Sequence, residues 1–324
     1  VADGVVLTGP DSGLTWTTMT VKLDGSSAKY QGKAAVMSAK TITGTGILDV
    51  THLGRNVANN ANVTFNSSNI AAGVQATAAI TVSTEIPDAS NFSRLDVVKV
   101  DAGQTATFAG SGHTSAKHAG KYTLTSANSL LGGSTTGTRV PATAANGMVV
   151  DGPGAFSIED ATAAALNLSN VSTSVTTKVY FKNEGGSTTY TLTGDCKLAT
   201  VDEIHVGTNV ILQINDVSGL TLPAQGTGKI IMSNANMKVK IDHAKANGME
   251  IIATSGTGGV LEVENFDATG VYDGTHQNTG NHLTSAKFLV TDTCTISNGS
   301  DLQLFDQIDV ASGKTLTVGG TVNF

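Results

Sequence analysis

The chain has 324 residues, of which only 14% are charged and 5% are aromatic, and its formal net charge is −7. It has no basic stripe, which excludes an electrostatic nucleic-acid surface, and no apolar run approaches the roughly 18 residues of a membrane helix. Abundant Thr, Ser, Asn, Val and Gly are typical of turn-rich β structure, and the evenly spread aliphatic residues argue against disorder.

Short alternating segments predict β-strands along the whole chain. Apolar side chains recur at every second position, and Gly, Asn, Asp or Ser bound each segment. The clearest strands are expected at residues 18–23, 63–65, 178–181, 229–232 and 237–241. Helical patterns are rare, and residues 158–168, with Ser157 as N-cap, predict either a short helix or a loop.

A long internal repeat organises these strands. The opening Val1-Ala2-Asp3-Gly4 returns in similar form at residues 100–103, 206–209 and 310–313, so neighbouring openings begin 99, 106 and 104 residues apart. Two further landmarks keep the same order. An Asp-x-Ile/Val-x-Val strand begins at Asp96, Asp202 and Asp306, and a Gly-x-Gly pair precedes a strand at residues 44–50, 152–158 and 256–263. This constant order predicts three copies of one module of about 105 residues.

The repeat sets the expected domains and leaves two all-β architectures. The modules span residues 1–94 (with a truncated start), 95–200 and 201–304, and residues 305–324 form a C-terminal partial repeat. Strands that begin 9–12 residues apart favour a β-solenoid-like stack with coils of about 20 residues. The module length also suits three tandem β-sandwich domains, since one sandwich usually has about 100 residues.

The composition resembles that of secreted bacterial β-rich surface proteins, such as S-layer subunits, adhesin repeats and extracellular fibres. The likeness covers the whole chain, but it rests on low charge, few Cys and high Thr, Asn and Gly rather than on a family motif. The resemblance implies an extracellular or cell-surface protein, and a start at Val1 fits a mature product that has lost its signal peptide.

The C-terminal segment suggests self-assembly. Residues 305–324 supply the strand that the first module lacks, and their alternation puts apolar side chains on one face. We expect head-to-tail contacts between copies, which generate filaments when they do not close; simple capping of the third module is the alternative. The expected assembly residues are Asp306, Ile308, Val310, Leu316, Val318, Val322, Phe324 and Val1.

Carboxylates are the residues that could carry chemistry. Polysaccharide-cleaving β-solenoids use Asp and Glu from adjacent coils. The candidates here are Asp151, Glu159 and Asp160, or Glu262, Glu264 and Asp267. The competing interpretation is outward carboxylates on alternating strands, and a single Trp, Trp16, disfavours a sugar-stacking site. No catalytic or cofactor-binding residue is therefore expected.

Histidines and cysteines give no metal or redox signal. His113 and His118, and His276 and His282, lie in polar loops without ligands at zinc spacing, so solvated loop histidines are expected. Cys196 and Cys294 occupy matching module positions 98 residues apart. Such positions are normally too distant for a disulfide, so two separately buried thiols are favoured over one bond.

Two further loop features are less specific. Asp267 and Asp273 lie in a Gly- and Asp-containing loop whose oxygen ligands suit Ca²⁺, although no known calcium-loop pattern is present. Asn-x-Ser/Thr occurs at Asn62, Asn66, Asn91, Asn167, Asn170 and Asn298, as an Asn- and Thr-rich chain produces by chance.

These observations together predict a secreted, non-enzymatic structural protein that assembles with itself into a surface layer, sheath or filament. The first alternative is an adhesin or phage-type fibre that binds glycans or a host surface. The second is a polysaccharide-active enzyme on a solenoid. Neither nucleic acid nor a membrane span is expected.

Overall fold

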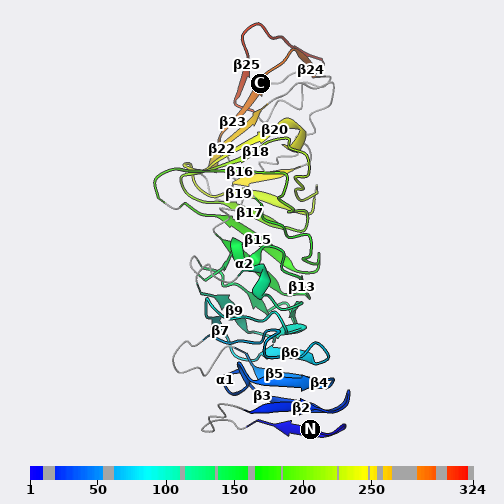
Figure 1. Cartoon of the computed structure of the whole chain (residues 1–324). Helices are drawn as coiled ribbons and strands as arrows, with labels where there is room; N and C mark the ends of the chain where they lie inside the picture. Colours follow the sequence, from blue (N-terminus) through cyan, green and yellow to red (C-terminus); the bar gives the residue numbers. More distant parts are fainter. Residues whose placement is uncertain are drawn as a thin grey trace. The chain divides into compact units, whose positions relative to one another are not determined.

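The chain forms a parallel β-solenoid of about 11 turns, with 46% of its residues in strands and 6% in helices, in a computed structural model. The structure describes residues 1–9, 19–53, 62–109, 114–135, 138–159, 165–183, 185–224, 226–246, 249–253, 258–264, 283–296 and 305–319. The chain divides into two compact units: Val1–Glu159 with Asn170–Thr176, and Asp160–Ser169 with Thr177–Phe324. Figure 1 labels many of the strands of both units.

The first unit contains one long sheet and two shorter sets of strands. The long sheet has the order β1 (Val6–Thr8), β3 (Lys29–Lys33), β5 (Ile47–His52), β6 (Gln75–Ile80), β8 (Val97–Val100), β10 (Tyr122–Leu124) and β13 (Val150–Asp151). A two-stranded sheet joins β2 (Thr20–Leu23) and β4 (Thr41–Gly44). A further set runs β7 (Thr84–Ile86), β9 (Thr105–Phe108), β11 (Leu130–Leu131) and β14 (Ala155–Glu159), and β12 (Val140–Pro141) also pairs with β14.

The second unit repeats this organisation. One set of strands runs β15 (Thr176–Phe181), β17 (Glu203–Val206), β19 (Lys229–Met232) and β21 (Glu250–Ala253). A six-stranded sheet has the order β16 (Thr188–Leu192), β18 (Val210–Ile214), β20 (Lys238–Asp242), β22 (Gly258–Glu264), β23 (Leu283–Val290) and β25 (Gln307–Val310). The last pair is β24 (Cys294–Ile296) with β26 (Leu316–Val318).

The strand pairing confirms the solenoid and rules out the tandem sandwiches. The strand pairs in the described part of the chain are parallel, as between β3 and β5 or β18 and β20, whereas sandwich sheets are antiparallel. Each coil therefore places its strands on those of the coil before it. Paired residues of the named strands lie between 18 positions apart, as for Lys29 and Ile47, and 28 apart, as for Ile47 and Gln75, and the isolated bridge of Asn167 with Lys197 spans 30.

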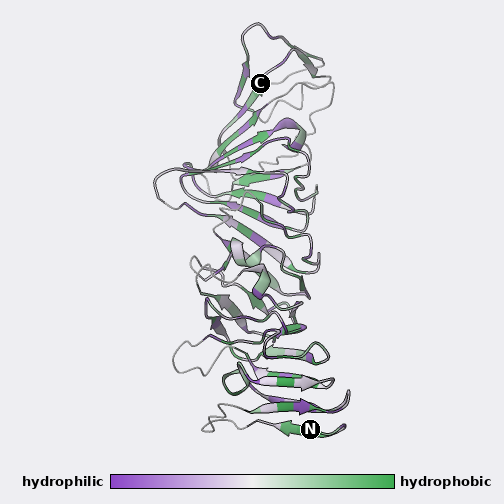
Figure 2. Cartoon of the chain, in the orientation of Figure 1, coloured by the Kyte–Doolittle hydropathy of each residue, from purple (hydrophilic) through white to green (hydrophobic). Residues whose placement is uncertain are grey.

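Alternation along each strand creates the core. In the six-stranded sheet Ile214, Ile241, Val263 and Phe288 occupy one register row, and each of these side chains is fully buried. Burying one such side chain contributes roughly 1.5–3 kcal/mol. Figure 2 shows hydrophobic and hydrophilic residues mixed along the same strands, as expected when alternate side chains face core and solvent.

The landmarks of the sequence repeat have shared structures. Each opening forms a turn in which the backbone N–H of the fifth residue donates to the carbonyl of the second, as from Gln104 to Asp101. The fourth residue has a positive φ: 73° at Gly4, 73° at Gly103, 60° at Asn209 and 75° at Gly313. Gly and Asn are the residues that tolerate this conformation. The module boundaries themselves stay predictions.

A one-turn helix also recurs once in each module, a feature that the sequence did not predict. These helices are α1 (Ala34–Met37), α2 (Ala142–Ala145) and α3 (His243–Ala246), and a 3₁₀ turn, η1, spans Ser115–Lys117. The helix expected at 158–168 is not found where it can be checked: residues 158 and 159 belong to β14, whereas residues 165–168 form a turn and a single bridge, as the loop alternative expected. Ile158 belongs to β14 and pairs in parallel with Val140, so the ladder overrides the local helical pattern.

The other predicted strands are found with small differences. Residues 178–181 lie in β15, residues 229–232 form β19, and the strand expected at 237–241 is β20, one residue later. Residues 20–23 form β2. The strand expected at 63–65 is reduced to a single parallel bridge between Thr64 and Asn91.

Candidate functional site

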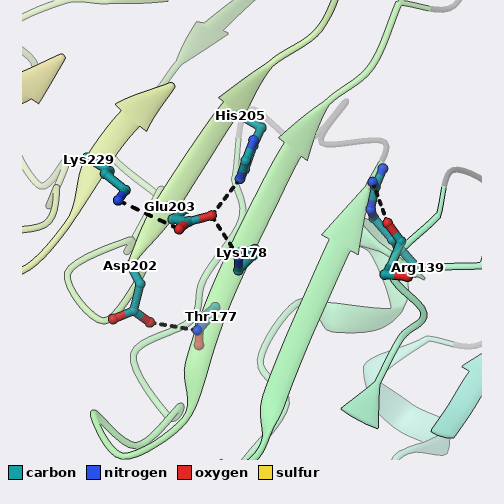
Figure 3. A network of polar contacts seen from close by, with 8 residues as sticks. Arg139, Thr177, Lys178, Asp202, Glu203, His205 and Lys229 are labelled. Carbon is teal, nitrogen blue, oxygen red and sulfur yellow. Dashed lines mark hydrogen bonds and ion pairs between the residues drawn. The ribbon is translucent and has the colours of Figure 1, made fainter. Parts of the chain in front are cut away.

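Charged side chains of the strand faces are joined across neighbouring coils, most densely around Glu203 on β17 (Figure 3). Lys178 Nζ on β15 lies 2.8 Å from Glu203 Oε2, and Lys229 Nζ on β19 lies 3.8 Å from Glu203 Oε1. The parallel register makes these three residues direct partners. Outward side chains at one register position lie about 4.8 Å apart, so opposite charges on successive coils are close enough to form ion pairs.

His205 completes this cluster from the same strand. Its Nε2 lies 2.8 Å from Glu203 Oε2. Its ring stacks on that of Tyr180, with centroids 4.3 Å apart and an interplanar angle of 13°. Tyr180 and His205 are register partners on β15 and β17. The stacking fixes the plane of the imidazole and directs one nitrogen toward the carboxylate.

The electrostatics of the cluster keep Glu203 ionised. Burial acts to raise the pKa of Glu203, but hydrogen bonds and charges from Lys178 and His205 outweigh it and lower that pKa below its usual 4.5. The hydrogen bond to Glu203 raises the pKa of Lys178. Both groups are therefore charged at neutral pH.

A second cluster lies on β20 and β22. Lys238 Nζ is 2.5 Å from Glu262 Oε1, and Lys240 Nζ is 3.2 Å from both Glu262 Oε2 and Glu264 Oε1. Burial acts to raise the pKa of Glu262, but the two lysines lower it overall. Hydrogen bonds to Glu264 and Glu262 raise the pKa of Lys240. This cluster has the same chemistry as the one around Glu203.

The first unit uses its carboxylates in the same way. Lys29 Nζ lies 2.6 Å from Asp49 Oδ2, and Lys121 Nζ lies 2.8 Å from Asp151 Oδ2. Burial acts to raise the pKa of Asp151, but the hydrogen bonds from Lys121 and Thr123 bring it below its usual value.

Glu159 lies in a more enclosed pair. Arg139 Nη1 is 3.4 Å from Glu159 Oε2, and the two side chains are 12% and 4% exposed. Arg139 Nη2 also donates to the carbonyl of Ser134 at 2.9 Å. A buried carboxylate of this kind depends on its cation, because removing one partner leaves the other charge uncompensated.

A further polar contact recurs at the Asp of the Asp-x-Ile/Val-x-Val landmark, and we call it the Asp clasp. In each clasp the Asp carboxylate accepts from a backbone N–H of the preceding coil, and the Asp backbone N–H donates to the carbonyl of that same residue. The three clasps are Asp96 with Ala76 (2.7 and 2.7 Å), Asp202 with Thr177 (2.7 and 2.9 Å), and Asp306 with Ala286 (2.8 and 2.8 Å).

The structure pairs the described sequence-predicted carboxylates with cations, and Glu262 and Glu264 share Lys240. Asp151, Glu159, Glu262 and Glu264 each face a cation. Asp160 and Asp267 lie outside the described residues, as do both calcium candidates, Asp267 and Asp273. Sequence reasoning missed the cationic partners. Lys178 and Glu203 are 25 positions apart, a spacing that acquires meaning only once the coil length is known.

The histidine and cysteine predictions have mixed outcomes. The solvated loop expected for His118 is wrong: the residue is buried, and its ring meets Tyr122 edge-on at 6.4 Å, because the chain turns inward after η1. His113, His276 and His282 lie outside the described residues. Cys196 and Cys294 are both buried and are not joined in a disulfide, which confirms two separate thiols.

The structure describes most of the expected assembly residues, and their contacts lie within their own chain. Asp306 forms its clasp, Ile308 and Val310 pair with Phe288 and Val290, and Leu316 and Val318 pair with Cys294 and Ile296. Val1 hydrogen-bonds within its own chain through Lys22 and Asp24. Val322 and Phe324 lie outside the described residues. The segment thus forms a further coil of its own solenoid, and the head-to-tail contact stays a prediction.

Three of the Asn-x-Ser sequences serve local structure. The side-chain Oδ1 of Asn66, Asn91 and Asn167 accepts from the backbone N–H of Ser68, Ser93 and Ser169, each at 3.0 Å. These are turns in which the Asn side chain replaces a backbone acceptor. The motif is therefore explained by coil geometry at these positions.

The described part of the chain contains neither a candidate metal cluster nor a candidate membrane helix. Within the part of the chain that the structure describes, no three His, Cys, Asp or Glu side chains gather as a metal site requires. Over the same residues, no helix has the length and apolar character to cross a bilayer. Comparisons with protein families, with curated proteins and with solved structures find no match for this chain.

Proposed function

We propose that this chain is a secreted, non-enzymatic structural protein that associates with itself into an extracellular layer, sheath or filament. One observation carries the proposal: the ionised side chains of the strand faces are joined coil to coil, as around Glu203 and Glu262. The Asp clasps add a second set of contacts in the same direction. Polar groups that connect successive coils serve the cohesion of the stack.

The protonation states support this role over glycoside hydrolysis. A general acid in such an enzyme needs a carboxyl group whose pKa is raised toward neutrality. Here the pKa values of Asp151, Glu203 and Glu262 are lowered instead. Carboxylates held ionised by lysines are suited to cohesion, and they are poor proton donors at neutral pH.

A glycan-binding role is the second candidate, and one observation favours it. Tyr180 and His205 form a partly exposed aromatic pair on an outward strand face. Tyr and His edges can pack against sugars and donate hydrogen bonds to them. This function requires no turnover and is compatible with a structural scaffold.

Sedimentation velocity across a wide range of protein concentration tests the proposal. A structural protein of this kind should pass from small species to large assemblies as concentration rises. A single small species at all concentrations contradicts the proposal. A glycan array then tests the binding alternative, with Tyr180→Ala as the matched loss-of-binding variant. A reducing-sugar assay on polysaccharides tests the enzymatic one.

A further inference from the structure

The outward side chains of β15, β17, β19 and β21 form a row of alternating charge. Lys178 pairs in register with Glu203, Glu203 with Lys229, and Lys229 with Glu250. The row therefore reads positive, negative, positive, negative across four successive strands of one unit. We call this row, with the neighbouring outward positions on the same strands, the alternating face.

The neighbouring row is aromatic and aliphatic. It consists of Tyr180, His205, Ile231 and Ile252, which are also register partners on the same four strands. Tyr180, His205 and Ile252 are partly exposed. The alternating face thus combines charges with apolar contact area, which is the composition of many protein–protein interfaces.

The charges within the row are not fully matched inside the chain. Glu203 holds Lys178 at 2.8 Å, but Lys229 stands 3.8 Å away, near the limit of an ion pair. Among the residues that the structure describes, Glu250 takes part in no ion pair. The side chains of Lys178 and Lys229 remain 33% and 34% exposed. The row therefore ends with a Glu250 that has no ion pair among the described residues, next to a Lys229 that is only loosely paired.

We infer that the alternating face binds a second copy of this chain, in an antiparallel two-fold arrangement. Reversing the order positive, negative, positive, negative exchanges the signs at each position. An antiparallel second copy therefore places its Glu250 against Lys178 and its Lys229 against Glu203. The two-fold axis repeats both contacts, which makes the interface isologous.

Other arrangements of two copies are less complementary. A parallel copy in the same register opposes Lys to Lys and Glu to Glu, and like charges in direct opposition are unfavourable. A parallel copy shifted by one strand matches three positions but leaves Lys178 of one copy and Glu250 of the other without counterparts. The antiparallel arrangement alone matches the four charges and also sets Tyr180 against Ile252 of the second copy.

Charge reversal distinguishes these arrangements. Glu250→Lys breaks no ion pair inside the described chain, so it is the primary variant. Lys178→Glu is the second variant. Together, Lys178→Glu and Glu250→Lys change the row to negative, negative, positive, positive. This order is again complementary to itself when reversed, but it is not complementary in the shifted parallel arrangement.

The measurement is the dimer dissociation constant from sedimentation velocity of the full chain in low salt. We expect each single reversal to weaken dimerisation at least about tenfold, and the double reversal to return it to within about threefold of the starting protein. Added salt should weaken the dimer, because the Debye length falls to about 10 Å at 0.1 M. Lys121→Glu, a reversal on the other unit that removes the ion pair with Asp151, should leave the dimer dissociation constant unchanged.

Three results overturn the inference: a monomer at all concentrations, single reversals without effect, or a double reversal weaker than either single one. The melting temperature of each variant is measured in parallel, so that a folding defect is recognised. If Lys178→Glu impairs folding, the effect of Glu250→Lys on the dissociation constant decides between the outcomes. The inference deepens the proposed structural role. If dimers form but no larger assemblies do, the structural role fails alone; if large assemblies form and ignore Glu250→Lys, the interface fails alone.

Discussion

The carboxylate of Asp202 accepts a hydrogen bond from the backbone N–H of Thr177 at 2.7 Å, and the Asp202 N–H donates to the Thr177 carbonyl at 2.9 Å. Thr177 is fully buried, so this backbone amide has no water to replace the carboxylate. The same clasp joins Asp96 to Ala76 and Asp306 to Ala286. The Asp that marks each repeat in the sequence therefore has a defined task, which is to hold its coil against the one before it.

Removing the clasp carboxylate should destabilise the fold. Asp202→Ala leaves the buried N–H of Thr177 unsatisfied, at an expected cost of about 1.5–3 kcal/mol in the free energy of unfolding. Asp202→Asn keeps an acceptor oxygen and should lose about half as much. Urea unfolding measures both. Asp216→Ala, which removes an exposed partner of Lys245, is the control and should cost less than about 1 kcal/mol. Equal effects of Asp202→Ala and Asp216→Ala contradict the role of the clasp.

Gly152 should be intolerant of any side chain. Its φ is 98°, and a Cβ there would overlap the carbonyl oxygen of Leu124. Gly152→Ala should cost about 3 kcal/mol, since left-handed backbone and overpacking both contribute. Gly103→Ala is the matched control: its φ is 73° but the space is open, so about 1 kcal/mol is expected. Gly103→Asn should cost least, because Asn209 occupies the equivalent turn. Thermal unfolding measures these costs. A melting temperature that falls further in Gly103→Ala than in Gly152→Ala refutes this explanation.

Breaking the enclosed pair of Arg139 and Glu159 should be costly from either side. Glu159→Gln leaves a largely buried guanidinium without its counter-charge, and about 3 kcal/mol of stability should be lost. Replacing both residues, Arg139→Met with Glu159→Gln, should recover much of that loss, because no charge then remains buried. Urea unfolding of the single and double variants gives the comparison. If the double variant loses as much free energy of unfolding as the two single variants lose together, Arg139 and Glu159 do not compensate each other.

The free energy of unfolding of the solenoid should fall in acid, because carboxylates that pair with lysines of neighbouring coils become protonated. Folding lowers the pKa of Glu203 and of Glu262 below their usual 4.5. A lowered pKa means that the stabilisation is present above about pH 4.5 and is lost as the pH falls through the folded-state pKa. Each partly exposed pair should contribute less than about 1 kcal/mol, because water screens it.

Glu203→Gln checks this pH dependence. The variant should melt lower than the starting protein at neutral pH and lose less on acidification, because it has no carboxylate to protonate at that position. Melting temperatures across the acid range provide the measurement. Glu85→Gln, at an exposed position on β7, is the control and should follow the starting protein. If the melting temperatures of Glu203→Gln and of the starting protein fall by the same amount on acidification, protonation of Glu203 does not contribute to the acid sensitivity.

Much of the fold could be predicted from the sequence, because alternation is a local signal. Residues 229–232 were expected as a strand and form β19 with the same bounds. The helix considered for 158–168 failed because Ile158 is placed in a strand by its pairing with Val140, a contact that no local pattern encodes, while the loop alternative holds at residues 165–168. His118 was misjudged for a related reason, since its polar neighbours concealed an inward ring packed on Tyr122.

The candidate site was harder to predict. Lys178, Glu203 and Lys229 are adjacent in space because successive coils place them in one register row. Coil lengths vary from 18 to 30 residues, so no fixed spacing in the sequence could align them. The Asp of the clasp was visible as a repeat landmark, but its partners Ala76, Thr177 and Ala286 share no residue type. What they share is a backbone N–H at a defined place on the preceding strand.

We propose that the polar contacts between coils belong to a structural protein that assembles with itself outside the cell. Electron microscopy of the purified full chain in low salt tests this claim most directly. The account predicts filaments, sheets or lattices with a regular repeat, and it predicts that Glu250→Lys reduces their lateral order. Micrographs that show only single, unassociated particles at high protein concentration contradict the claim.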